Sequence, residues 1–129
     1  MQTIIQGCQH IMDTHRGGQT EHFYGQMLAC YLYDRDIPFL MEGQCFTFGT
    51  RGTPVLVGRI DMEVAHSIIL EFKVGPRVTD KNVEQLMRYV KARQQTGMDV
   101  KDAAVICFRD DHTVEVKHYV IKKTSRFFE

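Results

Sequence analysis

The spacing of apolar residues along this 129-residue chain changes in a fixed order, and that order limits the folds it can adopt. Two stretches with helical spacing come first, at about residues 3–14 and 20–34. Runs rich in β-branched and aromatic residues follow at about 40–48, 55–64 and 68–74. A further helix is predicted at about 80–96, and two more strands at about 103–108 and 113–121. The order ααβββαββ predicts an α/β fold in which a three-strand meander precedes the crossover helix.

Residues that start helices or form turns set the boundaries of these elements. Thr20 and Thr79 are predicted N-caps, because a hydroxyl can accept a hydrogen bond from the first turn of a helix. Gly17-Gly18 ends the first helix, and Gly97 follows the last turn of the long one. Residues 49–54 and 65–67 are predicted turns between strands.

Length and charge narrow the class of protein. A chain of 129 residues predicts one domain covering residues 1–129. Sixteen Lys and Arg balance sixteen Asp and Glu, which excludes a globally cationic nucleic-acid binder but not a local basic patch. Such a patch is predicted at Lys117, His118, Lys122, Lys123 and Arg126, as a phosphate contact or equally as a solvated basic tail.

The chain shows no targeting or transmembrane segment, since it has no long apolar run and no signal-peptide pattern at its start. We therefore expect an intracellular, cytoplasmic protein, with a nuclear location left open. Its four cysteines form no CxxC pair, so we expect reduced, mostly buried thiols rather than a zinc site.

Two carboxylates and a lysine in the predicted meander are the most informative residues for function. Glu71 and Lys73 are two apart on a strand and share a face. If the turn is centred on His66, Asp61 lies opposite Glu71, at a Cβ separation of about 5 Å. Carboxylates that close repel each other unless a cation joins them, and Mg²⁺ or Mn²⁺ prefers such oxygen ligands. Charge alternation on a solvated strand is the alternative interpretation.

Two further acids belong to the same region of the sequence. Glu63 is predicted to share the face of Asp61, either as an extra acid or at a solvated edge. Glu21 falls on the apolar, core-facing stripe of the second helix, where an unpaired carboxylate would be costly. It is interpreted either as a structural carboxylate bonded to a backbone amide or as a third acid aimed at the metal.

Gln85 and Tyr89 are four residues apart on the long helix and share one face. They are predicted to lie at the edge of its core stripe, where the helix could overhang a site on the sheet. That stripe comprises Val83, Leu86, Met87 and Val90.

Taken in order, these residues resemble the pattern of the PD-(D/E)XK nuclease superfamily. The Glu on an early helix, the Asp, the Glu-x-Lys and the Gln-x-x-x-Tyr of the long helix resemble its RecB-like branch. The segment from Gly18 to Tyr24 is similar to the motif of the GxxExxY protein family, and the stretch from Asp34 to Phe39 also resembles that family. The resemblance implies a restriction-endonuclease-like core with a mixed central sheet flanked by helices.

The resemblance also implies roles for individual residues. Asp61 and Glu71 would bind Mg²⁺ (or Mn²⁺), with the Phe72 carbonyl as a further ligand and Glu21 supporting the metal directly or through water. Lys73 would position the attacking water, while Gln85 and Tyr89 would orient Lys73 or contact the phosphate. The implied activity is metal-assisted hydrolysis of a phosphodiester in nucleic acid, with DNA as the expected substrate.

Two alternatives remain beside the nuclease. The chain could be a catalytically silent module of the nuclease fold that binds nucleic acid or a protein partner, or an ordinary interaction domain whose Glu-x-Lys is coincidental. Size alone favours a homodimer, because a core of 129 residues offers little surface to a long duplex. The residues leave open DNA or RNA, endonuclease or exonuclease, and whether the chain turns over a substrate at all.

Overall fold

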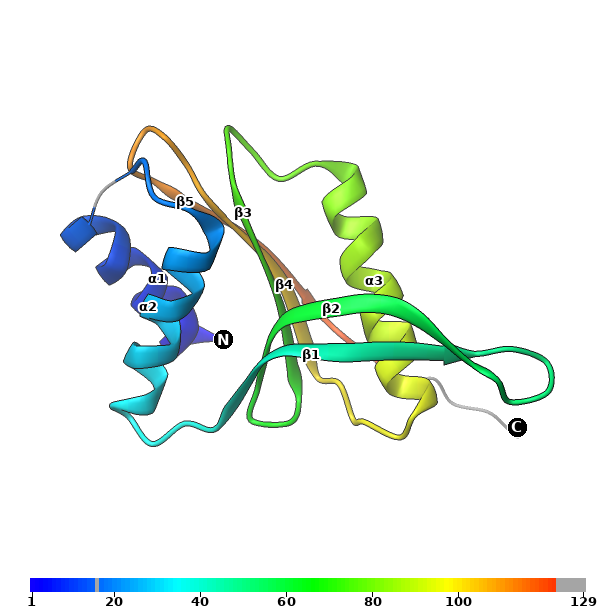
Figure 1. Cartoon of the computed structure of the whole chain (residues 1–129). Coiled ribbons are helices and arrows are strands. Elements are labelled where there is room, and N and C mark those ends of the chain that lie inside the picture. Colours follow the sequence, from blue (N-terminus) through cyan, green and yellow to red (C-terminus); the bar gives the residue numbers. More distant parts are fainter. Residues whose placement is uncertain (16, 123–129) are drawn as a thin grey trace.

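The computed structural model describes residues 1–15 and 17–122 of the chain, and its elements follow the predicted order (Figure 1). Three helices and five strands are formed by these residues: α1 (Gln2–His15), α2 (Glu21–Tyr33), β1 (Phe39–Phe48), β2 (Pro54–Val64), β3 (Ile68–Val74), α3 (Asp80–Gln95), β4 (Asp102–Phe108) and β5 (Val114–Val120). All of these boundaries fall within one residue of those predicted from the sequence. Lys123 and Arg126 of the predicted basic patch lie outside the described residues.

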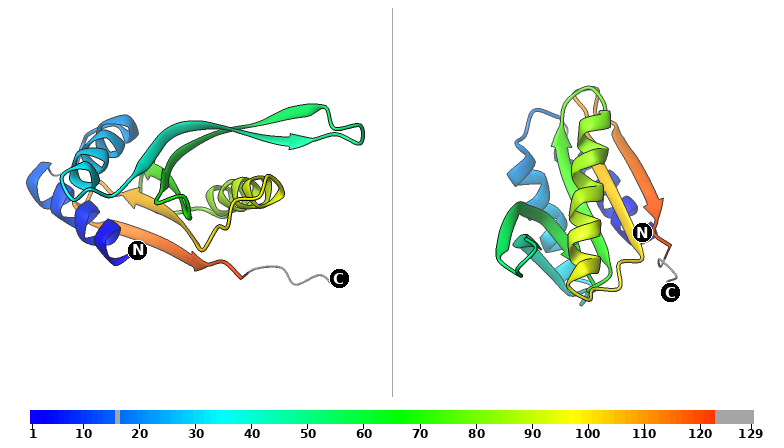
Figure 2. Two further views of the ribbon diagram at one scale, coloured as in Figure 1. Left: turned by 90° about the horizontal axis from the view of Figure 1, so that it is seen from below. Right: turned by 90° about the vertical axis from the view of Figure 1, so that its right-hand side faces the viewer.

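The strands form one mixed sheet in the order β1-β2-β3-β4-β5. β3 and β4 are parallel and are connected through α3, whereas the other neighbouring pairs are antiparallel. Helices α1 and α2 lie on one side of the sheet and α3 on the other (Figures 1 and 2). The predicted α/β fold, with a mixed sheet flanked by helices, is therefore confirmed.

Each face of the sheet has its own apolar core. On the first face, α1 and α2 cover residues such as Met62, Leu70 and Phe72, and Tyr24 stacks on Phe108 with ring centroids 4.2 Å apart. On the second face, α3 covers a cluster that includes Ile60. The side of the sheet that a strand residue faces can therefore be inferred from the cluster to which the residue belongs.

The predicted N-caps form as expected. The Thr20 hydroxyl accepts a hydrogen bond from the Phe23 amide at 3.1 Å, which fixes the start of α2. At the start of α3, Thr79 and Asn82 exchange side-chain to backbone hydrogen bonds in a capping box. The Thr20 cap comes directly before Glu21, and the Thr79 cap fixes the start of the helix that carries Gln85 and Tyr89.

The cysteines behave as expected from their scattered positions. Cys8, Cys45 and Cys107 are buried, Cys30 is exposed, and all four are free thiols. Burial raises the pKa of the Cys8 thiol to about 12, which keeps it protonated and unreactive. In the part of the chain that the structure describes, no helix is long and apolar enough to cross a membrane.

Strands β1 and β2 continue past the body of the molecule as a two-stranded arm (Figure 2). We define the arm as residues 44–59. Its register shifts between Cys45 and Phe46, so that Cys45 pairs with Gly58 but Phe46 pairs with Leu56. The arm leaves the body directly beside the residues that the sequence predicts for the site.

Candidate active site

The predicted site lies where β2 and β3 separate. Their regular pairing starts at the Ala65-His66 turn and ends at Met62 and Leu70. The next positions along this register are Asp61 and Glu71, as predicted from a turn centred on His66. Two carboxylates therefore lie directly beyond the last pair of hydrogen-bonded residues of β2 and β3. We call this place, where the two strands separate, the fork.

Each of these carboxylates bonds to the backbone of the opposite strand. The Asp61 amide donates to Glu71 Oε1 at 3.1 Å, and the Phe72 amide donates to Asp61 Oδ2 at 2.8 Å. These bonds replace the regular ladder and hold both side chains in the gap. The other oxygen of each carboxylate accepts no hydrogen bond from any residue that the structure describes.

The two carboxylates are held in an environment that penalises negative charge. Glu71 is only 5% exposed. Burial, followed by repulsion from Asp61, raises the pKa of Glu71 to about 8. The pKa of Asp61 is also raised, mainly by burial, and repulsion from Glu21 and Glu42 adds to this. The Lys73 ammonium attracts both carboxylates and opposes these shifts, so it lies within electrostatic range of the pair.

Glu21 lies at the rim of the site and not in the core, so its predicted core-facing position is wrong. It is the first residue of α2 and is exposed to solvent. Helical periodicity places Glu21 on the same side of α2 as the buried residues. It does not show that the first turn of this helix extends beyond the core. The Val74 amide lies 3.4 Å from Glu21 Oε2, and this contact brings the carboxylate to the end of β3. Repulsion from Glu21 raises the pKa of both Asp61 and Glu71.

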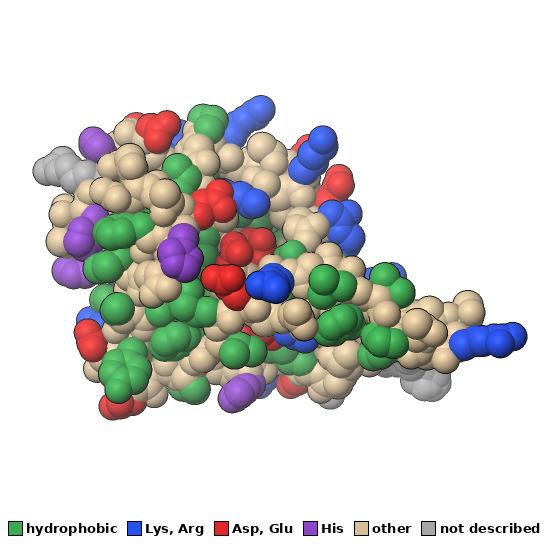
Figure 3. Space-filling model, viewed as in Figure 1, with side chains coloured by type: hydrophobic (Ala, Val, Ile, Leu, Met, Phe, Trp, Pro, Cys, Tyr) green, Lys and Arg blue, Asp and Glu red, His purple; other side chains and the backbone are tan. Residues whose placement is uncertain are grey.

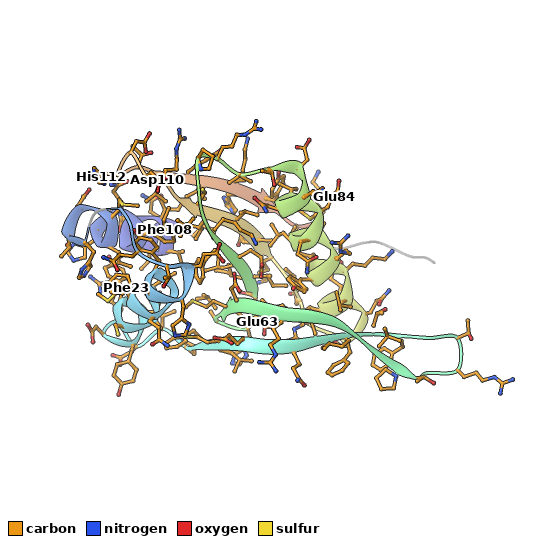
Figure 4. All side chains as sticks on the ribbon, turned by 45° about the horizontal axis from the view of Figure 1, so that its top comes forward. Phe23, Glu63, Glu84, Phe108, Asp110 and His112 are labelled. Atoms are coloured by element: carbon orange, nitrogen blue, oxygen red, sulfur yellow. The ribbon has the colours of Figure 1, made fainter. Side chains whose placement is uncertain are left out.

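Glu63 does not share the face of Asp61, and that prediction is also wrong. Ile60 packs under α3 but Met62 packs under α1 and α2, so the facing of β2 changes between them at Asp61. Glu63 consequently points to the α3 side, where it is 7% exposed. There it forms two hydrogen bonds with the Arg93 guanidinium, at 2.8 and 2.9 Å. Glu63 is neither an extra acid of the site nor a residue of a solvated edge; Figure 4 labels it on β2.

Gln85 and Tyr89 form a pair on α3 whose Tyr89 lies within electrostatic range of Asp61 and Glu71, but Tyr89 is not at the edge of the core. It is 5% exposed and belongs to the apolar cluster beneath α3. Burial raises the pKa of Tyr89; a hydrogen bond with the Gln85 side chain opposes this rise, and repulsion from Glu71 and Asp61 adds to it. Gln85 is half-buried and accepts a hydrogen bond from Arg88 at 2.6 Å.

The fit of Tyr89 against β2 depends on a glycine three residues before Asp61. A Cβ added to Gly58 would lie 2.5 Å from the Tyr89 hydroxyl oxygen and 3.2 Å from its ring. Because any side chain at this position would displace the ring, Gly58 allows α3 to approach the strand that carries Asp61.

A pocket of about 230 Å³ opens beside Asp61 on the α2 side of the sheet. Its lining residues are Glu21, His22, Gly25, Met41, Glu42, Asp61 and Phe72. In Figure 3, acidic side chains gather in the middle of the molecular face, near the root of the arm. This pocket gives a ligand access to the Asp61 side of the site.

Glu42 and His22 are two pocket residues that the sequence analysis missed. Glu42 has φ +55°, a left-handed conformation that is strained for this residue type within a strand. It lies between Met41 and Gly43, whose partners Met62 and Ile60 flank Asp61. The strained backbone thus directs a carboxylate to the pocket, 3.8 Å from the ring nitrogen of His22. His22 directly follows Glu21 in the sequence, which was the only available signal for it.

The donor set suits a hard divalent cation. Asp61 and Glu71 offer oxygen ligands, and their mutual repulsion would be relieved by a positive charge between them. Among the described residues, no group of three or more His, Cys, Asp or Glu side chains is arranged to hold a metal ion. Any such ion would therefore take further ligands from the backbone, from water or from a substrate.

The mixed sheet, the open fork and the carboxylate pair define a protein of the nuclease-like α/β class. The family model of the PD-(D/E)XK nuclease superfamily matches residues 1–119, and the chain belongs to this superfamily. The superfamily recognised from the sequence is thereby confirmed, whereas membership of the GxxExxY family stays a prediction. No curated protein matches the chain.

Proposed function

We propose that this protein is a metal-dependent nuclease that hydrolyses phosphodiester bonds of DNA. The observation that carries the proposal is the carboxylate pair at the fork of β2 and β3, with Lys73 in electrostatic range. Membership of the nuclease superfamily supports the reaction class. DNA as the substrate and Mg²⁺ as the cation are our proposals.

In this proposal, Asp61 and Glu71 hold Mg²⁺, or Mn²⁺, through the carboxylate oxygens that no described residue uses. The Phe72 carbonyl provides a further ligand, and Glu21 supports the ion directly or through water from the rim of the site. A divalent cation in this position supplies polarisation of the phosphoryl oxygen and a lowered pKa for bound water.

The protein side chains orient the reactants. The Lys73 ammonium donates a hydrogen bond that holds the attacking water beside the two carboxylates. The water oxygen then forms a bond to phosphorus while the bond to the leaving oxygen breaks; the water gives up a proton to solvent, and the leaving oxygen takes one up from solvent. Gln85 and Tyr89 keep Lys73 in place or contact the phosphate, and Gly58 supports them by letting Tyr89 pack closely against β2.

A cleavage assay tests this proposal. Labelled duplex, single-stranded and branched DNA would be incubated with the protein in Mg²⁺, in Mn²⁺ and in EDTA. We expect cleavage only with the metals, and its loss in the Asp61→Asn and Lys73→Met variants. Glu84→Gln on the exposed side of α3 is the matched control and should cleave like the wild type (Figure 4). Circular dichroism would establish that all variants are folded.

The opposite result has a clear meaning. If no DNA substrate is cut with either metal, DNA cleavage by this chain is refuted. Binding of nucleic acid that is unchanged by Asp61→Asn and by EDTA, without cleavage, would identify a silent module of the nuclease fold. Cleavage of RNA but not of DNA would refute DNA as the substrate but would agree with the proposed active site.

A further inference from the structure

The arm, residues 44–59, carries apolar side chains that are exposed to solvent, Phe48 and Leu56 among them. Cys45 packs in the cluster beneath α3, and the Thr47 hydroxyl lies 3.2 Å from Gln95 Oε1 of the same helix. Since side chains alternate along a strand, Phe46 and Phe48 lie on the opposite face. We call this the outer face of the arm.

The outer face is completed by residues from the second strand. Phe46 pairs with Leu56 and Phe48 pairs with Pro54, and directly paired residues share a face. Phe48 is 51% exposed and Leu56 is 52% exposed. Two aromatic rings therefore lie on a short apolar strip, and apolar side chains are visible along the arm in Figure 3.

This strip leads to the candidate active site. Ile60 faces α3, so Arg59 before it faces the other side, which is that of the outer face, and Asp61 lines the pocket on that same α2 side. Arg59 pairs with Gln44 and is exposed. At about 3.3 Å per residue, the seven steps from Pro54 to Asp61 span about 23 Å. An extended ligand on the outer face would thus pass Arg59 and reach the pocket at Asp61.

The charge of the arm indicates the chemistry of its ligand. Residues 44–59 contain two charged residues, Arg51 and Arg59, and no Asp or Glu. Neither arginine forms an ion pair with a residue in the described ranges. In a chain whose charges balance overall, the arm is a cationic segment that complements a polyanion.

We propose that the outer face of the arm binds a single-stranded segment of nucleic acid and leads it into the candidate active site. Arg51 and Arg59 contact phosphates, while Phe46 and Phe48 stack on unpaired bases, whose faces are accessible only outside a duplex. The outer face offers few groups that can read base edges, so binding tolerates different sequences. This inference rests on the proposed function for its substrate class, but it concerns binding and not the reaction.

Binding measurements with arm variants test the inference. The affinity for fluorescein-labelled single-stranded oligonucleotides would be measured by anisotropy in EDTA, over a series of salt concentrations. We expect Phe48→Ala to weaken binding about tenfold. The double variant Arg51→Ala/Arg59→Ala should reduce the slope of log K against log salt by about 1.4, because each phosphate contact contributes about 0.7 on a single strand.

Matched controls come from exposed residues away from the arm. Tyr33→Ala removes an aromatic side chain that is 74% exposed at the end of α2. Lys101→Ala removes an exposed cation next to β4. Both should leave the affinity and the salt slope unchanged. Because Phe48 and the two arginines are exposed, their replacement should not unfold the chain, and thermal denaturation would verify this.

The binding measurements distinguish failure of the proposed arm function from failure of the proposed nuclease activity. Weakened binding by the arm variants supports the inference even if the wild type cuts nothing, in which case only the proposed nuclease fails. If the arm variants keep the affinity and the salt dependence of the wild type, the inference is overturned, but any nuclease activity that has been observed still stands. Absence of oligonucleotide binding by the wild type also overturns the inference. A wild-type dimer in sedimentation that Phe48→Ala dissociates, without loss of oligonucleotide binding, would assign the outer face to a second copy of the chain and overturn it as well.

Discussion

Replacing Glu71 by Gln should remove the loss of stability that the metal-free protein suffers as pH rises from about 5 to about 8. The raised pKa means that folded Glu71 keeps its proton to about pH 8, whereas unfolded Glu71 loses it near 4.5. Between these values the folded state binds more protons than the unfolded state, so the free energy of unfolding falls as pH rises. Glutamine resembles the protonated side chain and has no such proton to lose.

The size of the effect follows from the two pKa values. A rise from 4.5 to about 8 corresponds to about 5 kcal/mol, at about 1.4 kcal/mol for each unit. This stabilising contribution is complete below about pH 4.5 and is lost by about pH 8. We therefore expect Glu71→Gln to match the wild type near pH 5 and to be several kcal/mol more stable near pH 8.

Urea denaturation in EDTA, followed by circular dichroism between pH 5 and pH 8, measures this difference. Glu84→Gln removes one carboxylate from the exposed side of α3 and controls for the change in net charge. The reasoning is refuted if the difference between Glu71→Gln and wild type stays constant over this range, or if the control shows the same rise. A constant difference would mean that Glu71 is ionised in the folded protein throughout.

Three further predictions concern the packing around the site. Arg93→Ala should lower the free energy of unfolding by about 3–5 kcal/mol, because it leaves Glu63 buried without its partner; thermal denaturation that shows no loss would contradict this. Gly58→Ala should destabilise the protein by forcing Tyr89 outward, and adding Tyr89→Phe should restore part of the lost stability. Equal stability of the single and double variants would count against the contact between residue 58 and the Tyr89 hydroxyl. Thr79→Ala should cost about 1 kcal/mol by removing the capping box of α3, and urea denaturation with an unchanged midpoint would argue against that role.

The elements could be predicted from sequence because local signals mark their ends. Thr20 and Thr79 cap their helices as predicted. The turn at Ala65-His66 fixed the register between β2 and β3, and from it followed the juxtaposition of Asp61 and Glu71. These features depend on residues that are close in the chain, where periodicity and turn chemistry are informative.

The wrong predictions concern residues whose positions depend on contacts between elements that are distant in the sequence. The facing of β2 changes at Asp61, opposite the left-handed residue Glu42, and strand alternation cannot anticipate such a change. Glu63 therefore reaches Arg93, thirty residues away, in place of the site. Tyr89 is buried because Gly58 leaves room for it, a relation that the spacing within α3 does not contain.

A crystal structure of the protein soaked with Mn²⁺ would test the central claim most directly. We predict an anomalous difference peak about 2.1 Å from oxygens of both Asp61 and Glu71, at the fork of β2 and β3, and no such peak in crystals of Asp61→Asn. Manganese bound elsewhere, or an empty fork at metal concentrations that support cleavage in solution, would contradict the account.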